Sequence, residues 1–169
     1  ANVYESHLAF PAGRRVTDDD ALEVMKMTLA GQCNIDLISA FAHHNVRAVG
    51  LSGLDSGLVR AHRRPPIDIT DDNGKGRTVD FGNVGDIDGV DPSLLETLQE
   101  AGFLPVIASM AGDDQGNPLN INADTVAEAI AVSMKAKKLI FLSDAPGVLR
   151  DKDDPSSLVP FADAKDIQE

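Results

Sequence analysis

The sequence predicts an α/β protein built on a mainly parallel sheet, and three observations carry this prediction. Apolar segments of strand character alternate with helical segments in the order strand, helix, strand, helix, strand. The stretch "KLIFL" at residues 138–142 is uniformly apolar, as expected of a parallel strand that is covered on both faces. The helical segments also carry start and stop residues, so the alternation does not rest on periodicity alone.

The first helix is expected within "RVTDDDALEVMKMTLAG". Thr17 is a candidate N-cap, the three aspartates after it complement the positive end of the helix, and Gly31 is a candidate stop. One stripe of the helix should be buried, and it consists of Leu22, Met25 and Leu29. A second helix is expected over residues 35–44.

The middle of the chain predicts two strands, hairpins and a further helix. Residues 47–53, "RAVGLSG", predict a short strand, and residues 58–88 hold paired prolines and a "DDNG" turn typical of irregular hairpins. In "GVDPSLLETLQEAG" we expect a helix capped by Asp91, with Pro92 at its first position and Gly102 at its end. "FLPVIASM" then predicts a buried strand, and "AGDDQGNPL" a turn.

The segment that begins at Asn120 combines a polar entrance with an amphipathic helix. Asn122 can cap this helix, and Asp124 lies in its first turn. The expected buried face consists of Ala123, Val126, Ala127, Ile130 and Met134. Capping explains Asn122, whereas Asn120 lies too early for that role. On the pattern alone, both helix-end chemistry and ligand contact remain open for Asn120 and Asp124.

Two predicted strands end in polar or small residues, which locates a candidate ligand cleft. "GLSGLDSG" follows one strand and "SDAPGV" follows another. In open α/β sheets, ligands bind outside the carboxyl ends of the strands. We therefore expect residues 120–124 and the loop after Leu142 to form two walls of one cleft. The chain contains neither a Walker A loop nor a dinucleotide-binding fingerprint, which disfavours a plain α/β oxidoreductase.

Composition and charge argue against nucleic acid and membrane partners. The formal net charge is −12, and such a surface repels nucleic acid and anionic membranes. No apolar run approaches the roughly 20 residues of a membrane-spanning helix. The basic stretch "RAHRR" at residues 60–64 is expected to be a solvated hairpin face.

The few sulfur and imidazole side chains do not predict a metal site. Cys33 is the single cysteine, which rules out an internal disulfide and agrees with a cytoplasmic location. We expect Cys33 to be a small buried residue. His43 and His44 are adjacent and should point to different faces of a helix, so a shared metal ion is not expected.

Five blocks occur in the order found in the acetylglutamate kinases of the amino acid kinase family. They are "GRRVTDDDALEVMKMTLAG", "RAVGLSGLDSGLVRA", "LLETLQEAGFLPVIASM", "LNINADTVAEAIA" and "KLIFLSDAPGVL", and they span roughly residues 13–151. The resemblance implies an αβα sandwich. It also implies phosphoryl transfer from ATP, with Mg²⁺, to the γ-carboxylate of N-acetyl-L-glutamate in arginine biosynthesis, in a cytoplasmic homodimer or higher homo-oligomer. The helix in "RVTDDDALEV" would form the dimer interface.

The same resemblance assigns roles to particular residues and segments. Arg15 and Asn120 would bind the amino acid substrate, and Asp124 would organise the catalytic lysines. The border of the ATP site would consist of Asp144, Ala145, Pro146, Gly147, Val148 and Leu149. The chain as a whole, residues 1–169, resembles one partial kinase domain. About 13–110 would be its substrate-binding and dimerisation part, and about 111–169 the start of its nucleotide-binding part.

The chain also departs from this family's pattern. Nothing before residue 13 matches the family's lysine and glycine pair, and Lys165 stands in the wrong context for the later catalytic lysine. Leu54 occupies the position of a lysine in many relatives. We therefore expect little or no kinase activity from these 169 residues alone. A kinase for a related acylated amino acid, of the aminoadipate type, and a non-catalytic binding module of the same fold are the alternatives.

Overall fold

The computed structural model describes residues 16–70, 76–143, 147–151 and 153–162. They fall into two compact units, residues 1–139 and 140–169. The first unit holds all the strands and the longer helices among the described residues. The second contains the short 3₁₀ helix Pro155–Ser157 and a bridge between Leu149 and Leu158.

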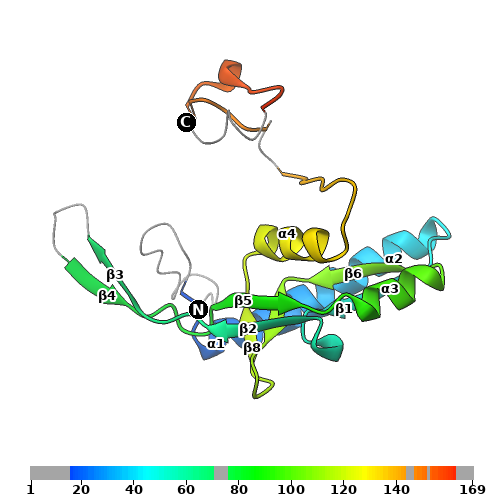
Figure 1. The fold of residues 1–169 in the computed structure, drawn as a ribbon, viewed down its shortest axis with the longest axis horizontal. Helices are drawn as coiled ribbons and strands as arrows, with labels where there is room; N and C mark the ends of the chain where they lie inside the picture. The colour runs from blue at the N-terminus through cyan, green and yellow to red at the C-terminus, as the bar shows by residue number, and fades with distance from the viewer. Residues whose placement is uncertain (1–15, 71–75, 144–146, 152, 163–169) are drawn as a thin grey trace, which may run out of the picture. The chain divides into compact units, whose positions relative to one another are not determined.

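The first unit interleaves helices and strands along the chain (Figure 1). Its helices are α1 Asp19–Met25, α2 Asn34–His43, α3 Ser93–Glu100 and α4 Ala123–Ser133, with a π-helical segment Lys26–Cys33 between α1 and α2 and a short 3₁₀ turn Asp55–Gly57. Its strands are β1 Ala48–Ser52, β2 Val59–Arg63, β3 Ile67–Thr70, β4 Gly76–Val79, β5 Gly85–Val90, β6 Leu104–Ala108, β7 Met110–Gly112 and β8 Pro118–Asn120.

The strand pairing is mixed. β1 runs parallel to β6, and β2 runs parallel to β7 where Arg60 lies opposite Gly112. The hairpin partners β2 and β5, β7 and β8, and β3 and β4 are antiparallel. Because β6 and β7 follow one another with a single residue between them, the β1–β6 pair and the β5–β2–β7–β8 sheet meet at this strand.

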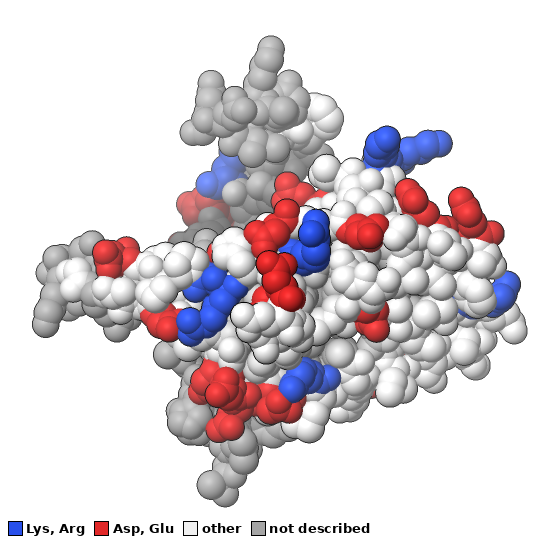
Figure 2. Space-filling model, turned by 60° about the horizontal axis from the view of Figure 1, so that its bottom comes forward, with Lys and Arg blue, Asp and Glu red and all other residues white. Residues whose placement is uncertain are grey.

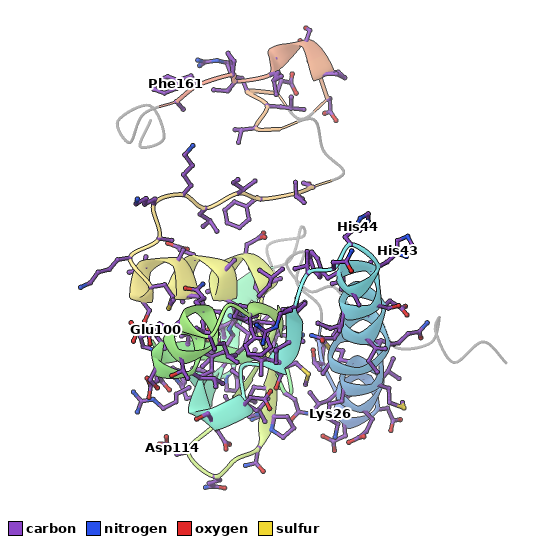
Figure 3. All side chains as sticks on the ribbon, turned by 90° about the vertical axis from the view of Figure 1, so that its right-hand side faces the viewer. Lys26, His43, His44, Glu100, Asp114 and Phe161 are labelled. Carbon is purple, nitrogen blue, oxygen red and sulfur yellow. The ribbon has the colours of Figure 1, made fainter. Side chains whose placement is uncertain are left out.

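Helices cover both sides of these strands, which confirms the expected α/β class. The helix α2 packs against β1 and β6, α3 packs against β6, and α4 packs against β5. Figure 3 shows α2 on one side of the strands and α3 and α4 on the other. The main core lies between the strands and the helices α3 and α4, and its fully or nearly fully buried members are Leu58, Val59, Ala61, Leu95, Ala111, Leu119, Ile121 and Val126.

Several predicted elements are confirmed. The strand at residues 48–52, the hairpin β3–β4, the strand that follows Phe103 and the helix after Asn122 all form. Gly102 ends α3 with a positive φ of 76°, as its position predicted. α3 begins one residue later than expected, with Pro92 as its cap residue and the Asp91 carboxylate accepting a hydrogen bond from the Ser93 amide at 3.0 Å.

The predicted start and end of the first helix are wrong. Asp18, not Thr17, is the N-cap, since its carboxylate accepts a hydrogen bond from the Ala21 amide at 2.8 Å. The helical backbone also continues through Gly31 into α2. A glycine inside a helix costs only about 1 kcal/mol, which packing against β1 and β6 can offset.

Two further expectations are corrected by the structure. Residues 138–142 form no strand, because none of the described strands supplies their backbone with partners, and Ile140 and Leu142 are 74% and 96% exposed. Cys33 is exposed rather than buried, because it lies on the solvent side of its helical segment. The short strand β8 was not expected; it lies in the segment where we predicted a turn.

Candidate functional site

The predicted substrate residue Asn120 ends β8, where four segments of the chain meet. Met110 lies opposite it in the β7–β8 ladder. The Asn120 amide donates to the Asn83 carbonyl at 2.8 Å, and the amide of Ile121 donates to the Ser109 carbonyl at 3.2 Å. These backbone bonds fix the position of Asn120, whose side chain remains half-buried rather than enclosed.

The Asn120 side chain binds to Thr17. Its Nδ2 donates to Thr17 Oγ1 at 2.9 Å. Thr17 is fully buried, and its backbone is tied on both sides: its amide donates to the Phe81 carbonyl at 3.0 Å, and its carbonyl accepts from the Asn83 amide at 2.7 Å. The Asn120 carboxamide is therefore anchored to a rigid part of the fold.

Asn83 connects this anchor to the start of α1. Its backbone binds both Thr17 and Asn120, and its side-chain Nδ2 donates to Asp19 Oδ1 at 2.8 Å. Gly82, which precedes it, has a φ of 70° and lies directly against the Thr17 carbonyl. Thr17 and Asn83 were not among the predicted site residues, because the contacts that reveal them join distant parts of the sequence.

The entrance of α4 lies two residues beyond Asn120. Asn122 caps the helix as predicted, and its Oδ1 accepts from the Thr125 amide at 2.9 Å. Asp124 lies in the first turn, and its side chain is exposed. Asn120 and Asp124 therefore flank the cap, and Asp124 is open to a cation or to a ligand from solvent.

The glycine-rich loop after β1 lies beside the same strand as Asn120. Gly53 packs so closely on β7 that an added Cβ would lie 2.1 Å from the Met110 carbonyl oxygen. The loop is closed by Asp55, whose Oδ2 accepts from the Ser52 amide at 2.6 Å and from the Ser52 hydroxyl at 2.8 Å. β7 therefore has this loop and Asn120 as neighbours. The second predicted strand end, after residue 142, does not follow a strand, because residues 138–142 form none.

The basic stretch at residues 60–64 is a hairpin face, as expected, and three of its basic side chains are paired within the chain. His62 Nδ1 lies 2.7 Å from Asp88, Arg63 makes two 2.9 Å bonds to the Asp80 carboxylate, and Arg64 binds the Asp86 carboxylate. Figure 2 shows basic side chains next to acidic ones on one face of the molecule. Such pairing leaves these cations little charge for an anionic polymer.

These ion pairs shift the ionisation of their members. The amide of Gly82 and then the Arg63 guanidinium hold the pKa of Asp80 below its ordinary value. The carboxylate of Asp86 raises the pKa of Arg64, chiefly through their side-chain hydrogen bond. Both pairs lie at the base of the β3–β4 hairpin, next to Phe81 and Gly82, which contact Thr17.

A groove of about 440 Å³ lies between α4 and β5. It begins at Thr125, next to Asp124, and its lining includes Val132, which is 72% exposed, as well as the carboxylates of Asp88 and Glu128. The two carboxylates make this groove a poor site for an anionic ligand without added cations.

Part of the predicted site lies outside the described residues: Arg15, Asp144, Ala145 and Pro146. The rest of the nucleotide segment belongs to the second unit. Gly147 has a φ of 141°, and an added Cβ would lie 2.8 Å from Leu158. Val148 accepts a hydrogen bond from the Val159 amide at 2.8 Å, and Leu149 bridges Leu158.

The described residues contain no group of three or more His, Cys, Asp or Glu side chains that could hold a metal ion. His43 ends α2 and His44 caps it, and Figure 3 shows both at that end of the helix. None of the helices in the described parts of the chain has the length and apolar character needed to span a bilayer.

Comparisons with known proteins agree on one family. The model of the amino acid kinase family matches residues 1–169. Curated relatives include the acetylglutamate kinase of Myxococcus xanthus, which is 47% identical over 92% of this chain and 51% of its own length. The acetylglutamate kinase of Methanothermobacter thermautotrophicus is 44% identical over 89% of this chain and 52% of its own length. The chain thus spans about half the length of these relatives.

Solved structures share the fold. The smu.665 protein of Streptococcus mutans UA159 matches with a TM-score of 0.69 and 27% identity, over 84% of this chain and 53% of its own. The N-acetylglutamate synthase of Neisseria gonorrhoeae, complexed with coenzyme A and N-acetyl-glutamate, matches with a TM-score of 0.65 and 25% identity. That match covers 85% of this chain and 30% of the synthase.

Proposed function

Because this chain belongs to the amino acid kinase family, we propose that it supplies the substrate-binding part of an acetylglutamate kinase. The whole protein would transfer the γ-phosphoryl group of ATP to the γ-carboxylate of N-acetyl-L-glutamate, in arginine biosynthesis. The observation that carries this proposal is the half-buried Asn120 carboxamide, held by Thr17 beside the α4 entrance that bears Asp124. The names of the relatives described above support the choice of substrate.

The chemistry of Asn120 suits an acylated amino acid. A carboxamide has two N–H donors and one carbonyl acceptor, and Thr17 uses one of the donors. The second N–H and the Oδ1 atom are thus available for the C=O and N–H groups of an acetamide. Arg15 would add a guanidinium fork for a carboxylate of the same substrate.

Asp124 is proposed as the catalytic carboxylate. Phosphoryl transfer relies on positioning and on neutralisation of the charge on the transferring group. Among the described residues, Arg63 and Arg64 are already paired with Asp80 and Asp86, so they offer little free charge to a phosphoryl group. An exposed carboxylate at the α4 entrance can hold the lysines that such a reaction requires in an ordered arrangement.

ATP and Mg²⁺ are the proposed cofactors. Mg²⁺ is commonly bound by one or two carboxylates together with substrate phosphates, so an all-protein cage is not required. We assign the border of the ATP site to residues 144–149. The bound ion would neutralise phosphate charge, and Gly147 would allow the backbone to turn tightly there.

We also propose an organisation for the whole protein. Residues of about 13–110 form the substrate-binding and dimerisation part, and residues of about 111–169 begin the nucleotide-binding part, within the partial domain 1–169. The protein would act in the cytoplasm as a homodimer or higher homo-oligomer that associates through the α1 segment, without nucleic acid or membrane partners.

The proposal is tested on the protein encoded by the full reading frame. ADP release is measured in a coupled assay with ATP, Mg²⁺ and N-acetyl-L-glutamate, and in parallel with an N-acylated aminoadipate. Turnover with N-acetyl-L-glutamate as the better substrate supports the proposal. If the enzyme prefers the aminoadipate compound, the protein is instead a kinase for that related acylated amino acid. Calorimetric binding of either ligand without ADP release would indicate a binding module.

A further inference from the structure

We propose that Thr17 is a positioning residue for the substrate: its hydroxyl holds the Asn120 carboxamide in the place where it can contact the ligand. The inference rests on the proposed function, because it assigns Thr17 a role in binding N-acetyl-L-glutamate through Asn120. Thr17 itself is fully buried and does not touch solvent. It therefore acts through Asn120 and not by direct contact with a ligand.

The contact holds the carboxamide in place. Asn120 Nδ2 donates to Thr17 Oγ1 at 2.9 Å, and Thr17 is fully buried. A buried hydroxyl has no water to replace a lost partner, so a side chain of Asn120 that swings away from Thr17 is disfavoured. The polar atoms of the carboxamide that Thr17 does not use are thereby kept at one place for the ligand.

The rigidity of Thr17 makes the contact effective. Its amide and carbonyl are both bonded to the segment 81–83, and Asn83 also accepts from the Asn120 amide. These backbone bonds do not require the Thr17 side chain. Nor does Thr17 cap α1, since Asp18 does. Within the described parts of the chain, the Thr17 hydroxyl bonds to Asn120 alone.

This separation makes the role testable in the full-length enzyme with two matched variants. Thr17→Val keeps the β-branched shape and the backbone bonds but removes the hydroxyl. Thr17→Ser keeps the hydroxyl. We expect Thr17→Val to raise the KM for N-acetyl-L-glutamate about five-fold to ten-fold, the size of one lost neutral hydrogen bond, with the KM for ATP unchanged. Thr17→Ser should restore the wild-type KM.

A double-mutant cycle with Asn120→Ala identifies the path of the effect. If Thr17 acts through the carboxamide, Thr17→Val should change the KM by less than about two-fold once Asn120 is alanine. An equal effect in both backgrounds would overturn the inference. So would a KM for N-acetyl-L-glutamate that does not respond to Thr17→Val, or a parallel rise in both KM values with a lower Tm, which marks a structural role.

A second readout does not depend on turnover. The Nδ2 protons of Asn120 should be distinct and exchange slowly in the ¹⁵N spectrum of the wild type, and exchange fast in Thr17→Val. Fast exchange already in the wild type would overturn the inference. If the wild-type enzyme does not phosphorylate N-acetyl-L-glutamate, the proposed function fails. If it does, but Thr17→Val behaves as wild type, only the role of Thr17 fails.

Discussion

Asn120 donates a hydrogen bond to Thr17 across 103 positions of sequence, and this 2.9 Å contact joins the end of β8 to the residue that precedes the cap of α1. The acceptor is fully buried, whereas the donor is half-buried. Such a pair holds a partly exposed polar group in a fixed place, which is what recognition of a small ligand requires.

Asn120→Ala should lower kcat/KM for N-acetyl-L-glutamate by about 10-fold to 100-fold, since it removes two neutral hydrogen bonds to the acetamide group of the substrate. The KM for ATP should not change. Steady-state kinetics of the full-length enzyme with each substrate varied in turn provide the measurement. Asn117→Ala, at an exposed asparagine in the β7–β8 turn, is the matched control and should leave both constants at wild-type values. Equal values of kcat/KM for N-acetyl-L-glutamate in the two variants would show that Asn120 does not bind the substrate.

Asp124→Asn should lower kcat by about 100-fold or more while leaving the KM for N-acetyl-L-glutamate within a few-fold, because electrostatic organisation acts mainly in the transition state. The α4 helix is retained, since its cap is Asn122. Glu128→Gln, one turn later on the same helix and exposed, is the control with the same loss of charge. A kcat for Asp124→Asn close to that of Glu128→Gln would contradict a catalytic role.

Gly50→Ala should destabilise the fold by about 2 kcal/mol, because an inserted methyl group forces buried side chains to move. Its Cβ would lie 2.0 Å from Asn34 Oδ1. Asn34 would have to give up its bonds to the carbonyls of Leu51 and Val106, which join α2 to β1 and β6. Urea unfolding measures the change.

The control for Gly50 is a glycine with room for a methyl group. Gly31 lies inside the helical segment, and an added Cβ would have its nearest neighbour at 3.6 Å. Gly31→Ala should therefore stabilise the protein by about 0.5–1 kcal/mol, since alanine is the better helix former. Stabilisation by Gly50→Ala would show that Asn34 is not locked in place.

Gly82→Ala should destabilise the fold more than Gly57→Ala does. Both glycines have nearly the same left-handed φ, 70° and 67°. Alanine at Gly82 would place its Cβ 2.2 Å from the Thr17 carbonyl oxygen, whereas nothing lies within 4 Å at Gly57. We expect Gly57→Ala to lower the free energy of unfolding by about 1 kcal/mol through backbone strain alone, and Gly82→Ala to lower it by more. Thermal unfolding compares them, and equal losses would show that the Thr17 contact is easily displaced.

Asp80 should contribute stability that is lost in acid. The Gly82 amide and the Arg63 guanidinium lower its pKa in the folded state. A lowered folded pKa means that the contribution is present above the unfolded value of about 4 and disappears as the pH falls through the folded value. The urea midpoint of the wild type should therefore fall between pH 5 and pH 2 by more than that of Asp80→Asn, as an order-of-magnitude window.

Arg63→Gln separates the two causes of the Asp80 shift. The hydrogen bond from Gly82 is the largest single cause and does not involve Arg63, so this variant should retain part of the acid dependence that Asp80→Asn removes. A pH profile for Arg63→Gln equal to that of Asp80→Asn would assign the whole shift to the ion pair instead.

Local chemistry in the sequence was sufficient for several elements. Asn122 and Asp124 were placed at the helix entrance because a cap and a first-turn acid act within three residues of one another. Gly102 was recognised as a stop because a positive φ favours glycine. The turn predicted in "AGDDQGNPL" is local as well, since the Asp113 carboxylate accepts hydrogen bonds from the amides of Gln115 and Asn117, two and four residues later.

Other features depended on partners far away in the sequence. Thr17 has the residue type of an N-cap, yet its hydroxyl binds Asn120 instead. Gly31 has the residue type of a stop, yet the helix passes through it into α2, which packs on β1 and β6. Residues 138–142 have the composition of a buried strand, yet no described strand pairs with them.

The amino-acid sequence by itself determined the α/β class, the capped entrance of α4 and the resemblance that led to Asn120 and Asp124. These depend on periodicity, on contacts within one helical turn and on motifs in order. Only the tertiary structure decided that Thr17 holds the Asn120 carboxamide, that Asn83 ties both to α1, and that Arg63 and Arg64 are already paired with Asp80 and Asp86. The physical reason is that a hydrogen-bond donor takes whichever acceptor the fold brings within about 3 Å, and the order of residues along the chain does not state which one that is.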